Sequence, residues 1–214
     1  MNNTLPDRLR LFLWVALGAW LGVAVPGLIG LFASQELPLM WWAARGLGLV
    51  AQLAMWMSVL FGVFVGAKGA GGVVETPWVR ELHMRWSLAS IGLVVLHVLF
   101  VVADPFAGVG PWAAVIPMAS PIRTQGVALG TFALLGLGGV YAATNQMKKL
   151  PPGVWRAVHG MSFGVFLLAM LHGLKAGTDA DDPVIRGMLL GSAVVVVGAI
   201  VQRVLLARET PARA

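Results

Sequence analysis

Two stretches of the chain, HMRWSLASIGLVVLH at residues 83–97 and HGMSFGVFLLAMLH at residues 159–172, each begin and end with a histidine. Together they contain all four histidines of the protein, and Arg85 is the only charged residue between the histidines. A helix that crosses a hydrocarbon layer of ~30 Å needs about 20 mostly apolar residues. With their apolar flanks, the two stretches therefore predict membrane-spanning helices with a histidine towards each end.

The composition of the whole chain supports a membrane protein. Of its 214 residues, 58% are hydrophobic and 11% are charged, and the mean hydropathy is +0.84. A soluble domain carries about 25% charged residues. The absence of cysteine from the sequence excludes disulfides, thiolate zinc sites, iron–sulfur clusters and thioether-attached haem. The formal charge of +6 is expected to report membrane topology, and no nucleic-acid partner is expected.

Six nearly uncharged runs are long enough to cross a membrane. They lie at about residues 10–32, 44–66, 81–103, 125–145, 155–174 and 184–206. We therefore expect an all-α polytopic membrane protein, a bundle of six transmembrane helices in contact with lipid, in which residues 1–214 form a single domain. The longest connection, residues 104–123, is too short for a nucleotide-binding βαβ unit of about 30 residues. No soluble domain, and no flavin or nucleotide site, is expected.

The distribution of Lys and Arg predicts the orientation of the bundle. If the N-terminus is cytoplasmic, eleven basic residues lie on the cytoplasmic side and four lie on the other side. Those four are Arg45, Arg123, Lys175 and Arg186. Cytoplasmic loops carry an excess of Lys and Arg. Both termini are therefore expected in the cytoplasm, and both histidine-bearing spans are expected to run outward.

The spacing of the histidines predicts two opposed pairs. His83 and His97 are 14 residues apart, a rise of about 21 Å along a helix, and His159 and His172 are 13 apart, about 19.5 Å. Two parallel helices would thus place one histidine of each span at an inner level and one at an outer level. Ionisable residues at membrane depth are costly and face the bundle interior. We therefore expect two facing imidazoles at each level.

An opposed imidazole pair supplies both axial ligands of a haem iron, which makes haem ligation the leading hypothesis. Three alternatives stay open. A zinc site prefers more ligands around one tetrahedral centre. A proton relay would interleave carboxylates with the histidines, and the interiors of the apolar runs contain none. Histidines that only form hydrogen bonds between packed helices are the third alternative.

The 13-residue spacing does not fit one straight helix face. Thirteen residues turn about 1300°, roughly 140° short of four full turns. We therefore expect a bend or a tightened turn between His159 and His172, and Gly160 and Gly164 favour one there.

Over about residues 80–182 the sequence resembles the ferric reductase-like transmembrane family. This family includes the membrane part of NADPH oxidases and single-domain bacterial haem subunits. The features that carry the resemblance are the thirteen residues between His83 and His97, the Trp155-Arg156 pair before His159, and the twelve residues between His159 and His172.

The resemblance implies two non-covalent haem b groups in a bacterial inner-membrane protein. His83 and His159 would ligate the iron near the cytoplasm, and His97 and His172 the iron near the outside. Electrons would pass outward from one haem to the next.

Four basic residues near these levels are candidate partners of haem propionates, because arginine binds carboxylates bidentately. Arg80 and Arg156 each stand three residues before an inner-level histidine, and Arg123 and Lys175 belong to the outer side. Flanking positive charge explains the inner two equally well.

The leading functional hypothesis is therefore an oxidoreductase that carries electrons across the membrane in a ferric reductase-like system. Without a nucleotide domain, it would depend on a separate cytoplasmic flavoprotein or quinol as donor. The alternative is a non-catalytic haem anchor that serves a periplasmic reductase partner, similar to the subunit of periplasmic methionine sulfoxide reductase. A transporter or structural bundle without haem is a third hypothesis.

Overall fold

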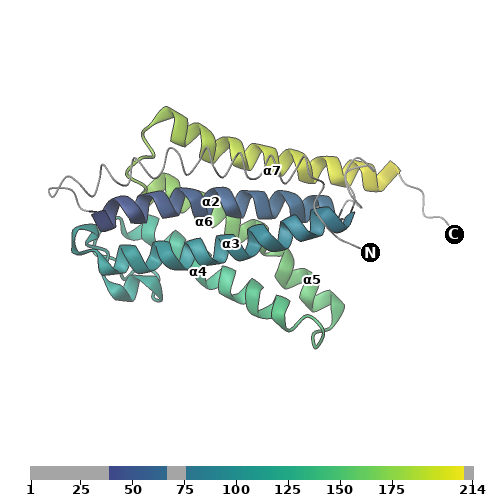
Figure 1. Cartoon of the computed structure of the whole chain (residues 1–214), viewed down its shortest axis with the longest axis horizontal. Helices are drawn as coiled ribbons and strands as arrows, with labels where there is room; N and C mark the ends of the chain where they lie inside the picture. The colour runs from purple at the N-terminus through teal and green to yellow at the C-terminus, as the bar shows by residue number, and fades with distance from the viewer. Residues whose placement is uncertain (1–38, 67–75, 210–214) are drawn as a thin grey trace. The chain divides into compact units, whose positions relative to one another are not determined.

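The computed structural model describes residues 39–66 and 76–209, and the first predicted span, residues 10–32, lies outside them. The described part is helical and contains no strand. Its long helices are α2 (Leu39–Gly66), α3 (Thr76–Ala103), α4 (Thr124–Asn145), α5 (Pro152–Gly160), α6 (Ser162–Ala176) and α7 (Pro183–Glu209) (Figure 1). Two short 3₁₀ helices, η2 (Pro105–Ala107) and η3 (Pro111–Ala114), lie between α3 and α4.

Five helices of the described part are long and apolar enough to cross a membrane, with α5 and α6 counted together. The all-helical class predicted from the sequence is therefore confirmed, and five of the six predicted spans coincide with helices that could cross a membrane. Helices α2 and α3 each begin five residues before the predicted runs. Each helix has an arginine near its start, Arg45 in α2 and Arg80 in α3, and a search for uncharged runs therefore misses the residues before it. Proline at the first helical position, as at Pro152 and Pro183, also favours an earlier start.

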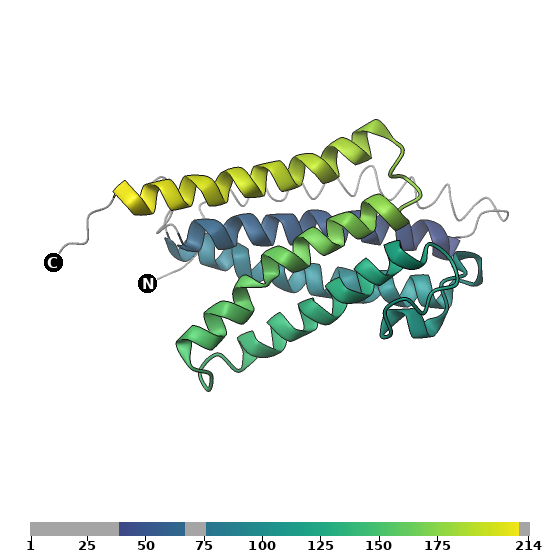
Figure 2. The same cartoon turned by 180° about the vertical axis from the view of Figure 1, so that it is seen from behind.

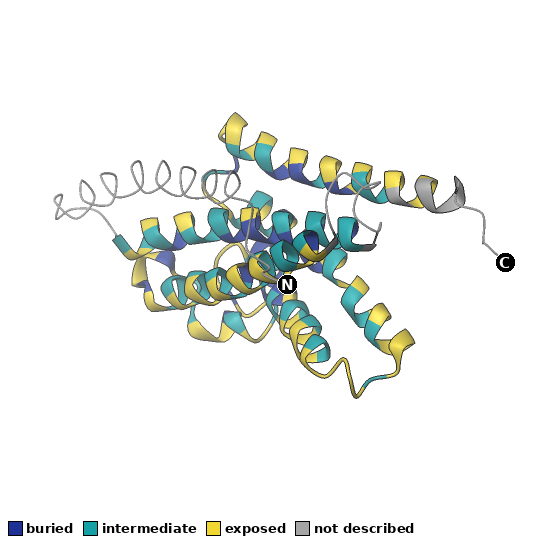
Figure 3. Ribbon diagram, turned by 45° about the vertical axis from the view of Figure 1, so that its right-hand side comes forward, coloured by how far each residue is buried: buried dark blue, intermediate teal, exposed yellow. Residues whose placement is uncertain are grey.

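The core lies where α2, α4, α6 and α7 meet. Phe166 of α6 is fully buried and packs with five other buried residues. These are Met55, Val59, Ala133, Val165 and Val196. Many large apolar side chains point outward instead, such as Leu88, which is 67% exposed, and Figure 3 shows exposed residues along the outer faces of the helices. Such faces are compatible with contact to lipid.

Helices α4 and α6 pack closely because glycines of α4 face α6. A Cβ atom added to Gly126 would lie 3.0 Å from the backbone of Ala176, and one added to Gly136 would lie 2.8 Å from Val165. Small residues allow helices to approach one another in membranes, where packing replaces the hydrophobic effect as the driving force.

The helix that carries His159 and His172 is interrupted at Met161, between α5 and α6 (Figure 2). The Met161 N–H donates to the carbonyl of Val158 at 3.1 Å, a contact between residues three apart that tightens the turn. The expected tightened turn between the two histidines is therefore present, and it lies two residues after His159.

Replacing Phe166 with alanine is expected to lower the free energy of unfolding, because the fully buried ring leaves a cavity. The loss should be below the about 3–5 kcal/mol of soluble cores, since lipid removes the water-transfer part of the cost. Phe132→Ala is the matched control, because Phe132 of α4 is 50% exposed. Denaturation in detergent micelles measures both variants, and equal losses would contradict the described core.

Candidate functional site

The four histidines come together in two facing pairs, one histidine of each pair from α3 and the other from α5 or α6. The ring centres of His83 and His159 are 5.9 Å apart, with an interplanar angle of 79°. Those of His97 and His172 are 6.2 Å apart, with an angle of 72°. The structure thus brings together the inner-level and the outer-level residues as the spacing on two parallel helices predicts.

The distances between the ring centres are compatible with one metal ion between the rings of each pair, and also with an edge-to-face ring contact. An ion bound to one nitrogen of each ring at about 2 Å holds the ring centres roughly 6.3 Å apart, with about 1.1 Å from each nitrogen to its ring centre. A direct hydrogen bond of about 2.9 Å between facing nitrogens would bring the centres to about 5 Å. The observed distances are nearer the first value, and no hydrogen bond joins the rings of either pair in the described part.

Three of the histidines bond to a backbone carbonyl of a neighbouring helix through Nδ1. His83 donates to Ser58, His97 to Ala44 and His172 to Gly126, each at 2.8 Å. A carbonyl oxygen only accepts, so the hydrogen-bond network assigns the proton of each ring to Nδ1. The lone pair of a neutral ring is then on Nε2. This is the state in which a histidine binds a metal, with its other nitrogen bonded to an outer partner.

Each of these three rings rests on a glycine four residues after the accepting carbonyl. Residues four apart share a helix face, so the accepting carbonyl and the glycine lie next to each other on the helix surface. We call each such pair, a carbonyl and the glycine four residues after it, a glycine notch. The three notches are Ala44 and Gly48 on α2, Ser58 and Gly62 on α2, and Gly126 and Gly130 on α4. A Cβ atom added to the glycine would lie 3.0 Å from the ring of His97, 3.2 Å from that of His83 and 2.7 Å from that of His172. The missing side chain thus lets the ring reach the backbone.

A cavity of about 390 Å³ surrounds the outer pair. Helices α2, α3, α4 and α6 form its walls, and residues of η2 and η3, such as Phe106 and Ala113, line it as well. The lining is mostly apolar, with His97 and His172 among its few polar groups. Its size falls within the about 300–1,000 Å³ of sites that bind small molecules and cofactors. His83 and His159 are not part of this lining.

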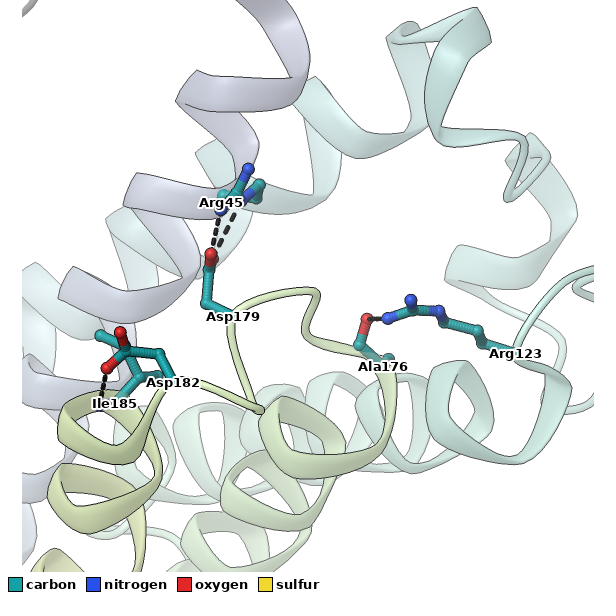
Figure 4. Close-up of polar contacts among 6 residues, drawn as sticks. All are labelled: Arg45, Arg123, Ala176, Asp179, Asp182 and Ile185. Carbon is teal, nitrogen blue, oxygen red and sulfur yellow. Dashed lines mark hydrogen bonds and ion pairs between the residues drawn. The ribbon is translucent and has the colours of Figure 1, made fainter.

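The predicted basic residues differ in their position. Arg123 lines the cavity and donates to the carbonyl of Ala176 at 2.6 Å (Figure 4). Lys175 is exposed and does not line the cavity. Arg80 and Arg156 are exposed on α3 and α5. Within residues 39–66 and 76–209, no hydrogen bond or ion pair orients either arginine towards the inner histidine pair.

Arg45 was predicted to lie on the outer side but not to belong to the site. Arg45 lines the cavity and forms an ion pair with Asp179, whose Oδ2 accepts from Nε at 2.9 Å. Its guanidinium also lies 4.4 Å from the centre of the Trp42 ring. The only sequence signal was a lone charge beside an apolar run, which also marks a membrane boundary. Asp182 caps α7 by accepting from the Ile185 N–H at 3.1 Å.

The fold and the site together define a helical membrane protein with two facing histidine pairs between its helices. Residues 39–179 match the family described as Domain of unknown function (DUF8596), and the chain belongs to this family. The match includes all four histidines, the three glycine notches and Asp179. No ferric reductase family model matches the chain. No curated protein and no solved structure matches the chain.

Replacing Gly130 with alanine is expected to push the His172 ring away from the Gly126 carbonyl, because the new Cβ would lie 2.7 Å from Nδ1. Overpacking of this kind costs about 1–3 kcal/mol of unfolding free energy. Gly139→Ala on the same helix is the control, since a Cβ there meets nothing within 4 Å. Denaturation in micelles compares the two, and a Gly130→Ala variant as stable as Gly139→Ala would contradict the notch.

Proposed function

We propose that this chain is the haem-binding membrane subunit of an electron-transfer system. It carries electrons from a donor at the cytoplasmic face to an acceptor outside the cell membrane. His83 and His159 would hold one b-type haem, and His97 and His172 the other. The observation that carries the proposal is the geometry of the two pairs, whose rings face each other at 5.9 and 6.2 Å.

The residues around the pairs fit this role. Bound haem supplies reversible one-electron chemistry, tuned by its axial ligands and their hydrogen bonds. The glycine notches hold three rings through Nδ1, and the outer pair lies in a mostly apolar cavity. Arg123 lines the same cavity and supplies positive charge for a carboxylate, as does Arg45, which is paired with Asp179.

The geometry also weighs on the alternatives. The described residues contain no group of three or more His, Cys, Asp or Glu side chains placed to hold a metal ion. A tetrahedral zinc site takes at least three protein ligands, so two-ligand sites favour a cofactor that brings its own metal and equatorial ligands. Three of the histidines do bond to a neighbouring helix, as the packing alternative expects, and what favours haem is the repeated pairing of the rings at two levels.

We place the outer pair at the extracytoplasmic side of a bacterial inner membrane, in a six-span bundle that includes residues 10–32 and has both termini in the cytoplasm. Three of the four basic residues assigned to that side contact the last residue of α6 or the segment that follows it. These contacts are Arg45 with Asp179, Arg123 with Ala176, and Arg186 with Asp181. The grouping supports the Lys and Arg distribution from which the orientation was predicted.

A cytoplasmic flavoprotein or quinol is the proposed donor, and ferric ion is the proposed acceptor of a ferric reductase-like oxidoreductase. One observation favours a second function, that of a haem anchor serving a periplasmic reductase partner. The residues that cover the outer cavity expose large apolar side chains, with Phe106 68% and Trp112 69% exposed. An exposed apolar patch next to the outer site is suited to contact with a protein partner.

Replacing His97 with leucine is expected to remove the outer haem and keep the inner one, so that the haem content falls from two per chain to one. His83→Leu should do the reverse. Val98→Ala is the control, because Val98 lines the same cavity beside His97 and is not a ligand. Haem extraction and visible spectra of the purified variants measure the outcome. Two haems retained in either histidine variant would refute the assigned pairing.

A further inference from the structure

The glycine notches repeat along the helices at the spacing of the histidines. On α2 the carbonyls of Ala44 and Ser58 are 14 residues apart, as are His83 and His97, which bond to them from α3. On α4 the notch for His172 is formed by Gly126 and Gly130. A step of 14 residues along α4 leads to Val140 and Thr144. The repeat thus predicts a fourth notch there, facing His159.

A threonine occupies the glycine position of this fourth notch. Thr144 Oγ1 donates to the carbonyl of Val140 at 2.8 Å, and it lies 3.4 Å from Nδ1 of His159. The hydroxyl hydrogen is used on Val140, so the oxygen is left to accept from the Nδ1–H of His159. The hydroxyl therefore stands between the ring and the carbonyl that the ring would otherwise use.

The reason for the difference is the spacing of the histidines. His159 and His172 are 13 residues apart, whereas the notches on α4 are 14 apart. On an unbroken α-helix His159 would lie about 1.5 Å nearer the outer level than the notch does, and the tightened turn at Met161 reduces this offset. A glycine at 144 would leave the ring without a partner at its own height, and a hydroxyl bridges the offset. The ring of Trp155 stacks on the ring of His159, with ring centres 5.2 Å apart and an interplanar angle of 21°.

We infer that Thr144 is a positioning residue that makes the inner site electronically different from the outer one. The inference rests on the proposed function. A contact of 3.4 Å to a hydroxyl is weaker than the 2.8 Å bonds to carbonyls at the other three histidines. An outer hydrogen bond raises the basicity of a ligating histidine. His159 is thus the weakest electron donor of the four, which favours reduced iron at the inner site.

The redox test uses the full chain with haem bound and compares three variants. Thr144→Val keeps the shape but removes the acceptor, so the midpoint potential of the inner haem should rise while that of the outer haem stays unchanged. Thr144→Ser should restore the wild-type value. Thr131→Val is the control for the inner potential, because Thr131 of α4 is buried, bonds to Ala113 and Val127, and lines the cavity of the outer pair. An unchanged inner potential in Thr144→Val, or an equal rise in Thr131→Val, overturns the inference.

A second measurement needs no haem. Nitrogen NMR of the histidine rings in haem-free protein in micelles reports which nitrogen carries the proton. Thr144→Val should lower the Nδ1–H fraction of His159 and leave the other three histidines unchanged. If the chain binds no haem and His159 still shifts, the proposed function fails, and only the hydrogen bond from His159 to Thr144 is confirmed. If haem binds and His159 does not respond, the role of Thr144 fails and the proposed function stands.

Discussion

The hydrogen bond from an imidazole Nδ1 to a helix carbonyl is the interaction on which the rest of the structure depends. At membrane depth no water is present to satisfy that N–H, and an unpaired polar group there is costly. A carbonyl inside a helix is accessible only where the helix surface is open. Glycine four residues later provides the opening. Three histidines form this hydrogen bond. Each bond fixes the axial position and the distance of one helix relative to its neighbour.

Two requirements on α4 are met by the same residue type. Gly126 lets the backbone of α6 approach, and Gly130 leaves room for the ring of His172. A larger residue at either position would separate α4 from α6 or turn the ring away from the cavity. Close packing and the open space around the outer pair therefore do not compete here, because the glycines stand on different turns of the helix. The packing of α4 on α6 and the candidate site therefore depend on one pattern of small residues.

The sequence predicts the helical class, because long apolar runs have few other solutions in a membrane. It also predicts which histidines face each other, and the tightened turn between His159 and His172, since both follow from helical rise and rotation. The glycine notches could not be predicted from the sequence, because the acceptor is a backbone carbonyl, which every residue type has. The ion pair of Arg45 with Asp179 joins segments distant in sequence, and neither residue type nor spacing indicates such a pairing. A charged residue near the end of a span can reflect either membrane topology or a contact with a ligand. For this reason the sequence does not decide whether Arg80 is a partner of a haem propionate.

The central claim is that the two histidine pairs each bind a haem. The most direct test is a reduced-minus-oxidised visible spectrum of the purified full-length chain, together with the haem content per chain after extraction. The account predicts the spectrum of b-type haem with two nitrogen ligands, at two haems per chain. A chain that contains no haem after expression with ample haem supply would contradict it.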